Sequence, residues 1–471
     1  MEKRNRIEIL DCTIRDGGYY NHWDFSDDLV NEYVSTLNLT PVKYIEIGYR
    51  SFPSTGFKGM YYNISVKRMA EVKEISNLKI ALMVDLKNIQ KKEEWGLILD
   101  KIGDQINLLR LTYNPFDNPE KILDHIKYLK NNYDFKIALN MMYASKWKLD
   151  EPIFEYLKSD CEVDYFYIVD SYGGLTPIDC LHIYESVRKN IHESIKIGFH
   201  GHNNLELALA NSIALIDKVD IIDATVLGMG RGAGNLKLEL LLSYLKFHQK
   251  YNFELSSLTK LTSLFQPLLN QYKWGTNLPY MIAGITSFPQ SEVMGWVQTK
   301  VISLDTMVNS IITLEDEKEN YINESYPSKL NQVLLIGGGS SVKKYMDYLK
   351  LYLMKNLDLV LIFSSSKYLE EFHNLPHKKY LSIIGDDEEV STHNLKNFEL
   401  FYSSNHRIIK PHLRREIGAK SLRLPKTELF NTKYPNHLAN CANLILHSNP
   451  EKIEIVGYDG YDSGLYFDNG L

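Results

Sequence analysis

Three side chains that suit one divalent metal each follow an apolar segment of this chain: Asp16, His200 and His202. On an extended strand, His200 and His202 point to the same side, because they are two residues apart, and both imidazoles can reach one ion. One carboxylate and two imidazoles leave positions open for substrate oxygens, which suits Mn²⁺, Mg²⁺, Fe²⁺ or Zn²⁺ acting as a Lewis acid. A 2-oxo acid chelates such an ion through its carboxylate and carbonyl oxygens. These residues therefore predict metal-assisted chemistry on an anionic substrate.

A guanidinium stands directly beside the predicted metal carboxylate, in Arg15-Asp16-Gly17. One interpretation is a local ion pair in a turn. Alternatively, Arg15 donates hydrogen bonds to the enolate oxygen that develops when a C–C bond next to a carbonyl forms or breaks. We therefore predict that Arg15 is both a catalytic and a substrate-binding residue.

Eight short apolar runs alternate with segments of helical period before residue 250. The runs are 7–12, 42–47, 79–84, 106–111, 136–141, 165–169, 195–199 and 221–226. Such runs, apolar on both faces, are typical of parallel strands with crossover helices. Eight units of this kind match the size of a closed (β/α)8 TIM barrel, and an open doubly wound sheet is the alternative. Polar residues follow the runs, which favours the barrel because all its strands end on one face.

The rest of the chain predicts two further parts beyond a barrel at 1–249. Residues 250–325 indicate a helical extension that either covers the site or makes a subunit contact in a homo-oligomer. Charged residues near its end, at 315–320, predict a solvated link. Residues 330–471 predict a smaller α/β, Rossmann-like domain. Its turn at 337–341 either approaches the phosphate of a nucleotide or sugar phosphate or is an ordinary tight turn.

Composition excludes several classes of protein. The chain has 471 residues, of which 44% are hydrophobic, enough for more than one core. The net charge of −6, without a basic block, argues against nucleic acid and anionic membranes as partners. No apolar run approaches the roughly 20 residues of a membrane helix, and no signal-peptide core follows the N-terminus, so we expect a cytoplasmic protein. The four cysteines include no Cys-x-x-Cys pair and indicate buried, reduced thiols.

Several motifs together resemble those of the DRE-TIM metallolyase superfamily. In chain order they are Asp-Cys-Thr-Ile-Arg-Asp-Gly at 11–17, Ile-Glu-Ile-Gly at 45–48, Asp-Ser at 170–171, Phe-His-Gly-His-Asn at 199–203 and Gly-Met-Gly-Arg-Gly-Ala-Gly-Asn at 228–235. This superfamily contains hydroxymethylglutaryl-CoA lyase and 4-hydroxy-2-oxovalerate aldolase. The resemblance extends over about residues 1–290. It implies a (β/α)8 barrel with a divalent metal, Mn²⁺ or Mg²⁺ ahead of Zn²⁺ or Fe²⁺, on Asp16, His200 and His202.

The same resemblance assigns roles to four other residues. Asn235 stands where some members supply a further metal ligand, and a loop-capping amide is the alternative. Glu46 and Asp170 occupy motif positions that line the pocket in the family, although either can be a buried structural carboxylate. Ser171 can offer hydroxyl or backbone donors to a substrate carboxylate. We therefore predict that Glu46, Asp170 and Ser171 bind substrate together with Arg15.

Within the superfamily the chain is most similar to 4-hydroxy-2-oxovalerate aldolase-like proteins of bacterial surface polysaccharide gene clusters. The motif at 11–21 and the segment 274–280 carry this likeness. The aldolase pattern has a histidine, proposed as general acid/base, where this chain has Tyr19, and His22 follows three residues later. An imidazole titrates near physiological pH, whereas a phenol needs a metal or cations nearby, which favours His22 and leaves Tyr19 open.

The sequence thus predicts a metal-dependent carbon–carbon lyase of the class II aldolase type. It would act through a pyruvate-like 2-oxo-acid enolate, with an aldehyde or sugar as the second substrate, in surface polysaccharide or unusual sugar biosynthesis. One alternative is an acyl-CoA-dependent Claisen-condensing synthase, for which no acyl-CoA signature is recognisable. Another is a non-catalytic barrel that serves as a scaffold for the C-terminal domain.

Overall fold

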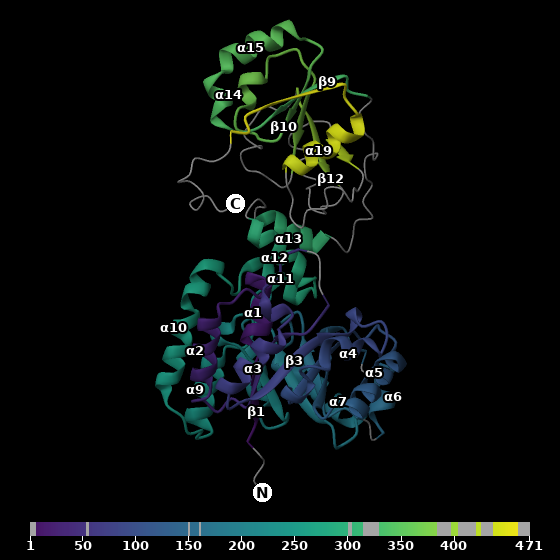
Figure 1. The fold of residues 1–471 in the computed structure, drawn as a ribbon, viewed down its shortest axis with the longest axis vertical. Coiled ribbons are helices and arrows are strands. Elements are labelled where there is room, and N and C mark those ends of the chain that lie inside the picture. Colours follow the sequence, from purple (N-terminus) through teal and green to yellow (C-terminus); the bar gives the residue numbers. More distant parts are fainter. Residues whose placement is uncertain are drawn as a thin grey trace. The chain divides into compact units, whose positions relative to one another are not determined.

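The computed structural model of the chain is shown in Figure 1. It describes residues 6–52, 56–148, 151–159, 162–299, 304–313, 329–383, 397–403, 421–424 and 437–459. The chain forms two compact units, Met1–Val293 and Met294–Leu471, and each is described by itself. None of the helices in the described ranges combines the length and the apolar character needed to cross a membrane.

Eight parallel strands close the first unit into a barrel. They are β1 (Glu8–Asp11), β2 (Tyr44–Tyr49), β3 (Lys79–Asp85), β4 (Leu108–Tyr113), β5 (Lys136–Met141), β6 (Tyr165–Asp170), β7 (Lys196–Gly201) and β8 (Ile221–Ala224). Each strand pairs with the next, and β1 pairs with β8 from Glu8↔Ile221 to Asp11↔Ala224. The predicted (β/α)8 barrel is confirmed, and the open doubly wound sheet is excluded for this unit.

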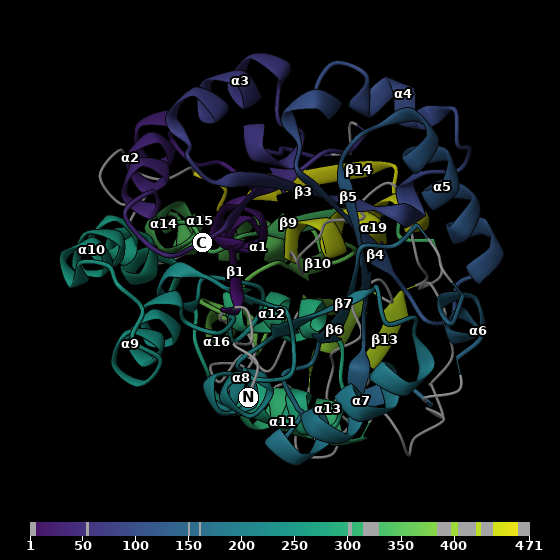
Figure 2. The ribbon, with the colours of Figure 1, turned by 90° about the horizontal axis from the view of Figure 1, so that it is seen from below.

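Helices surround these strands, as Figure 2 shows for α3 to α7. The α-helices are α1 (Thr13–Asn21), α2 (Asp27–Leu37), α3 (Val66–Ile75), α4 (Glu94–Leu99), α5 (Pro119–Asn132), α6 (Ile153–Leu157), α7 (Pro177–Asn190), α8 (Ala208–Leu215) and α9 (Leu238–His248). Short 3-10 turns lie at Met60–Tyr62, Leu86–Asn88, Gly103–Gln105, Ala144–Lys146 and Val226–Gly228. Local sequence determines where several of these helices begin. Thr176 and Asp179 form a reciprocal capping box at the start of α7, with Pro177 in its first turn.

The predicted helical extension begins with α10 (Leu255–Tyr272) and α11 (Leu278–Ile285), followed by α12 (Gln290–Thr299) and α13 (Leu304–Thr313). Its first part holds the loops that follow β7 and β8. Trp274 Nε1 donates to the Leu227 carbonyl at 2.9 Å, and Asn204 Nδ2 donates to the Tyr280 carbonyl at 2.8 Å. Those two loops carry residues of the predicted metal site, so this segment supports the site. The predicted subunit contact stays a prediction.

Side chains from seven of the eight strands form a buried cluster in the barrel interior. These are Leu10, Tyr44, Ala81, Leu108, Ala138, Tyr165, Tyr167, Val169 and Ile221. Charged side chains are buried in the same unit, since Glu46, Arg110 and Asp223 are all at most 2% exposed. The barrel is therefore a packed core, and its chemistry lies at the carboxyl ends of the strands.

The second unit contains a parallel six-stranded sheet in the order β13-β12-β11-β10-β9-β14. Its strands are β9 (Gln332–Ile336), β10 (Val360–Phe363), β11 (Lys379–Ser382), β12 (Glu399–Ser403), β13 (Ser421–Leu424) and β14 (Lys452–Val456). Its further helices are α14 (Ser340–Lys344), α15 (Met346–Lys355), α16 (Leu369–Phe372) and α19 (His437–Ser448). The predicted second, smaller α/β domain is confirmed. The predicted charged link at 315–320 lies outside the described residues.

The glycine-rich turn after β9 is held by an acidic residue that follows β14. The amide of Ser341 donates to Asp459 Oδ2 at 2.6 Å, and the Ser340 hydroxyl donates to the same oxygen at 3.3 Å. A carboxylate of the chain thus occupies the place that a phosphate would take at this turn. Binding of a nucleotide or sugar phosphate by this domain stays a prediction.

Three of the four cysteines, Cys12, Cys180 and Cys441, are free and buried, as their scattered spacing predicts. Cys161 lies outside the described residues.

Candidate metal centre

Asp16, His200 and His202 converge at the carboxyl end of the barrel. Asp16 lies in α1, directly after β1, while His200 lies in β7 and His202 immediately follows that strand. One ligand atom from each of the three lies within 4.8 Å of the other two. All three residues are at most 4% exposed. Residues almost 190 positions apart therefore meet around one point, because β1 and β7 end on the same face of the barrel.

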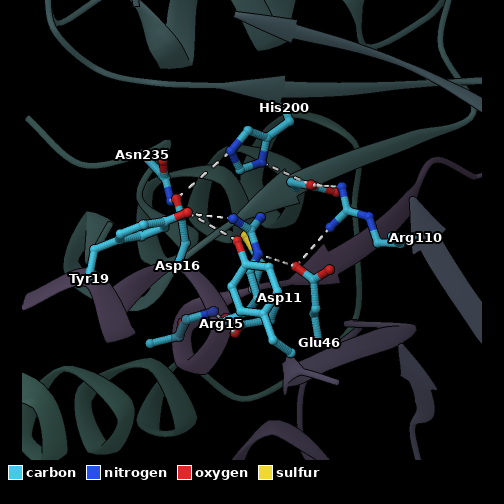
Figure 3. Close-up of polar contacts among 12 residues, drawn as sticks. Asp11, Arg15, Asp16, Tyr19, Glu46, Arg110, His200 and Asn235 are labelled. Carbon is cyan, nitrogen blue, oxygen red and sulfur yellow. Dashed lines mark hydrogen bonds and ion pairs between the residues drawn. The ribbon is translucent and has the colours of Figure 1, made fainter. Parts of the chain in front are cut away.

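Asn235 joins this group. A β-bridge pairs Asn235 with His202. The Nδ2 of Asn235 donates to Asp16 Oδ2, and Figure 3 shows the side chains of Asn235 and Asp16 pointing toward each other. Within the described part of the chain, neither Asn235 Oδ1 nor His202 Nδ1 has a hydrogen-bond partner, although both atoms are buried. Buried polar atoms are almost always paired, so a cation at this point would account for the cluster. The donors fit a divalent metal.

Electrostatics put these groups in their metal-binding forms. Burial raises the pKa of Asp16, but Arg15 and the two imidazoles outweigh it and hold this pKa well below its usual range. Burial lowers the pKa of His202 to about 3 against the attraction of Asp16. At neutral pH the carboxylate is therefore charged and the imidazole neutral, as metal ligands must be.

Charged side chains of alternating sign lead from Asp16 into the barrel interior, and His200 closes them into a ring, most of which is visible in Figure 3. Arg15 contacts Asp16 and, through Nε, Glu46 Oε2 at 2.7 Å. Arg110 Nη1 contacts Glu46 Oε2 at 2.9 Å, and its Nη2 contacts Asp223 Oδ2. The ring closes through His200, whose Nδ1 lies 2.9 Å from Asp223 Oδ2 and whose Nε2 lies 3.8 Å from Asp16 Oδ2. We refer to these six residues as the charge ring.

The charge ring fixes the orientation of His200, a predicted metal ligand. A carboxylate that accepts from one ring nitrogen of a histidine turns the other nitrogen toward the metal. Asp223 contacts His200 in this way, and Arg110 holds Asp223. The guanidinium also lies over the Tyr167 ring, 4.3 Å from its centroid.

Our sequence analysis missed Arg110 and Asp223. A signal was available, since each is a lone charge in an otherwise apolar strand segment, Leu-Leu-Arg-Leu and Ile-Ile-Asp-Ala. A charge that enters a barrel interior must meet an opposite charge there. The sequence pattern does not show which residue carries that opposite charge.

A cavity of about 400 Å³ opens in front of the predicted metal ligands. Its lining residues are Arg15, Asp16, Tyr19, Tyr49, Met83, Asp85, Lys87, Thr112, Asn114, Asp117, Asn140, Met142, Tyr143, Val169, Ser171, His200, His202 and Arg231. They come from the ends of most strands of the barrel, as expected for the binding face of this fold.

Of the predicted substrate-binding residues, Arg15 and Ser171 line this cavity, whereas Glu46 and Asp170 are not among its lining residues. Glu46 lies behind Arg15 within the charge ring. Asp170 accepts from the amides of Gly174 and Leu175, both at 3.2 Å, and so shapes the loop after β6. Burial raises the pKa of Asp170 to about 7.

The two residues predicted as proton carriers lie in different surroundings. Tyr19 lines the cavity, and its hydroxyl lies 3.1 Å from that of Tyr49. His22 is not among the lining residues. It ends α1 in a left-handed conformation with φ of 58°, and its carbonyl accepts from the amide of Gly59.

Comparison with known proteins places the chain in a family. The sequence profile of the HMGL-like family matches residues 6–266, more than half of the chain. The chain belongs to the HMGL-like family. An oxaloacetate decarboxylase of Mycobacterium tuberculosis is 26% identical over 244 residues, which are 50% of this chain and 69% of that protein. A 4-hydroxy-2-oxovalerate aldolase of Carboxydothermus hydrogenoformans is 28% identical over 254 residues, 51% of this chain and 70% of that protein.

Among solved structures, the N-terminal domain of a candidate aldolase from Bacteroides vulgatus is 41% identical, with a TM-score of 0.60. The match covers 64% of this chain and 100% of that domain. These matches confirm the family predicted from the motifs and the predicted enzyme class, a metal-dependent carbon–carbon lyase.

Replacing Arg110 with methionine tests the charge ring. Arg110→Met leaves Glu46 and Asp223 facing each other without their shared cation in the barrel interior. We expect the free energy of unfolding to fall by about 3–5 kcal/mol, because uncompensated buried charges are costly. We also expect metal affinity to fall by about 10- to 100-fold through loss of His200 orientation. Denaturant unfolding and metal titration measure the two effects.

The matched control is Lys260→Met, which removes the cation of an exposed pair with Glu32 at 3.2 Å. An exposed pair contributes little, so this variant should stay within about 1 kcal/mol of the parent. Equal stabilities for the Arg110 and Lys260 variants would contradict the importance of the ring.

Proposed function

We propose that this protein is a divalent-metal-dependent aldolase-type lyase, which makes or breaks a C–C bond beside the carbonyl of a pyruvate-like 2-oxo acid. The observation that carries the proposal is the convergence of Asp16, His200 and His202 with Arg15 at one end of a cavity. The relatives named as aldolase and oxaloacetate decarboxylase support it, because both names denote chemistry beside a 2-oxo group.

The metal, Mn²⁺ or Mg²⁺ ahead of Zn²⁺ or Fe²⁺, would be held by Asp16, His200, His202 and Asn235. When bound, it supplies a Lewis acid for the substrate carbonyl. Arg15 supplies hydrogen-bond donors from the protein. Its Nε and one Nη donate to Glu46 and Asp16, and the remaining N–H groups are available to an enolate oxygen in the cavity. Because ion pairs already fix this guanidinium, it does not reorganise as charge develops.

Ser171 is suited to the substrate carboxylate. Its hydroxyl oxygen accepts from the amide of Tyr143 at 2.9 Å, so its own proton can be donated into the cavity. We propose that Ser171 and Arg15 orient the 2-oxo acid, while Glu46 and Asp170 position the groups that do so.

We propose Tyr19, rather than His22, as the residue that exchanges a proton with the alcohol oxygen of the second substrate. Tyr19 lines the cavity, and the guanidinium of Arg231 lies 5.5 Å from its ring centroid. Burial keeps the pKa of Tyr49 well above its usual range, so Tyr49 stays protonated and can donate to the Tyr19 oxygen. These are the cationic and hydrogen-bonding neighbours that a phenol needs for proton transfer.

The primary test is Asp16→Asn. We expect this variant to lose stoichiometric metal and, with it, the exchange of pyruvate methyl protons with deuterated water, measured by NMR, because the anionic ligand is gone. Asp85→Asn serves as a control for removal of a cavity carboxylate outside the metal cluster, and it should still retain metal. A metal-replete Asp16→Asn protein with normal exchange would overturn the proposal.

A second test separates the two proton carriers. Tyr19→Phe should lower the rate of aldol cleavage by about 100-fold or more, the usual contribution of a general acid or base, and should change the pH profile. His22→Ala should keep the parent profile. The reverse pattern would assign the role to His22.

Decarboxylation of a 2-oxo diacid is a second candidate reaction, favoured by the relative named oxaloacetate decarboxylase. Loss of carbon dioxide leaves the same enolate, so the metal ligands and Arg15 would serve equally. The two reactions differ in the need for a proton at an alcohol oxygen. If decarboxylation is the main reaction, release of carbon dioxide from oxaloacetate should exceed aldol cleavage of 4-hydroxy-2-oxo acids, and Tyr19→Phe should leave that release intact.

A further inference from the structure

The cavity has a second polar wall, away from the metal ligands. Asp85, Thr112 and Asn140 all line it, from the ends of β3, β4 and β5. They stand in one row, because the strand register pairs Asp85 with Thr112 and Thr112 with Asn140. In the closed order of eight strands, β3 to β5 lie across the barrel from β7, β8 and β1, which carry or directly precede the metal ligands.

Hydrogen bonds fix one end of this row. The Thr112 hydroxyl donates to Asp85 Oδ1 at 2.9 Å, and Lys87 Nζ lies 2.7 Å from Asp85 Oδ2. The carboxylate therefore has a defined direction and a partner for its charge. A wall balanced in this way suits neutral hydroxyl groups better than a second anion.

The other end of the row is left unsatisfied. Asn140 is 3% exposed, and its Oδ1 has no hydrogen-bond partner among the described residues. A buried amide oxygen without a partner is unfavourable, and it lines a cavity that a ligand can enter. An amide offers both donors and an acceptor, whichever way its two ends are assigned, and a hydroxyl group complements either.

The volume of the cavity is large enough for pyruvate together with a second substrate that carries several functional groups. About 400 Å³ falls within the range of pockets that enclose molecules of several functional groups. Pyruvate at the metal would fill only the part beside Arg15 and Ser171. The row of Asp85, Thr112 and Asn140 would then face the second substrate.

We propose that this row is a hydroxyl-binding subsite, and that the second substrate is a polyhydroxylated aldehyde, an open-chain aldose, rather than a simple alkyl aldehyde. The inference rests on the proposed function. In the addition direction the methyl carbon of pyruvate releases a proton to water, and the resulting enolate carbon forms a bond to the aldehyde carbon. The aldehyde C=O π electrons move to its oxygen, which takes a proton from Tyr19. All atoms of pyruvate and the aldose are retained in a 4-hydroxy-2-oxo acid, and Tyr19 is reprotonated from solvent.

The test compares aldehydes of equal carbon number with the metal-loaded full chain and pyruvate. D-erythrose is set against butanal and D-glyceraldehyde against propanal, and kcat/KM for aldol addition is measured. We expect the hydroxylated member of each pair to be preferred by at least about 10-fold, because an alkyl chain leaves the polar wall unpaired. Asn140→Leu, of similar size, should lose most of that preference.

Two further variants make the result specific. Thr112→Val removes the hydroxyl that orients Asp85 and should lower the preference for hydroxylated aldehydes by a smaller factor. If the Asn140 variant does not fold, this variant tests the subsite in its place. Asn132→Leu makes the same change on the exposed end of α5, outside the cavity lining, and should keep the parent preference.

Exchange of pyruvate methyl protons is followed in parallel, because it needs no second substrate. Exchange by the parent protein without a preference for hydroxylated aldehydes would overturn the subsite and leave the proposed function standing. Absence of exchange would instead contradict the proposed function. Retention of the full preference by folded Asn140→Leu and Thr112→Val variants would also overturn the subsite.

Discussion

The site depends on the electrostatic balance of the charge ring inside the barrel. A charge removed from water is tolerated only beside opposite charges with good hydrogen-bond geometry, and here each guanidinium bridges two carboxylates. The ring contains three carboxylates and only two guanidiniums, an excess of one acidic group. A divalent cation bound at Asp16 would balance this excess of negative charge. The ring thus suits the proposed metal site, and its contacts fix the side chains of Arg15 and His200.

Closure of the barrel lets one cavity perform two tasks. β1, β7 and β8 bring the predicted metal ligands, the carboxylate that contacts His200 and the Arg15 guanidinium to one side, while β3 to β5 end in a polar row on the other. Each strand contributes at its carboxyl end, so the proposed metal site and the proposed subsite for the second substrate can vary separately. The loops after β7 and β8 are held by the segment that follows α10, which makes this part of the extension a support for the site.

Tyr19 marks where this chain departs from the aldolase pattern that it resembles. A phenol in place of an imidazole changes what the surroundings must provide, and the cavity supplies a cation, Arg231, and a hydroxyl partner, Tyr49. His22 is also close to the motif in sequence, but it lies in different surroundings from Tyr19. Its left-handed backbone ends α1, and the side chain is outside the cavity lining. The distance of a residue from a motif in sequence does not show whether its side chain reaches the site.

The amino-acid sequence by itself determined the barrel and the convergence of the three predicted metal ligands. Strand and helix periods are local, and the three residues lie at or just after the ends of β1 and β7, so the shared end of parallel strands brings Asp16, His200 and His202 together. Only the tertiary structure decided the supporting contacts. Arg110 meets Asp223 across 113 residues, and Glu46 and Asp170 turn away from the cavity into hydrogen bonds behind it. These outcomes depend on barrel closure and on side-chain direction, which no local pattern records.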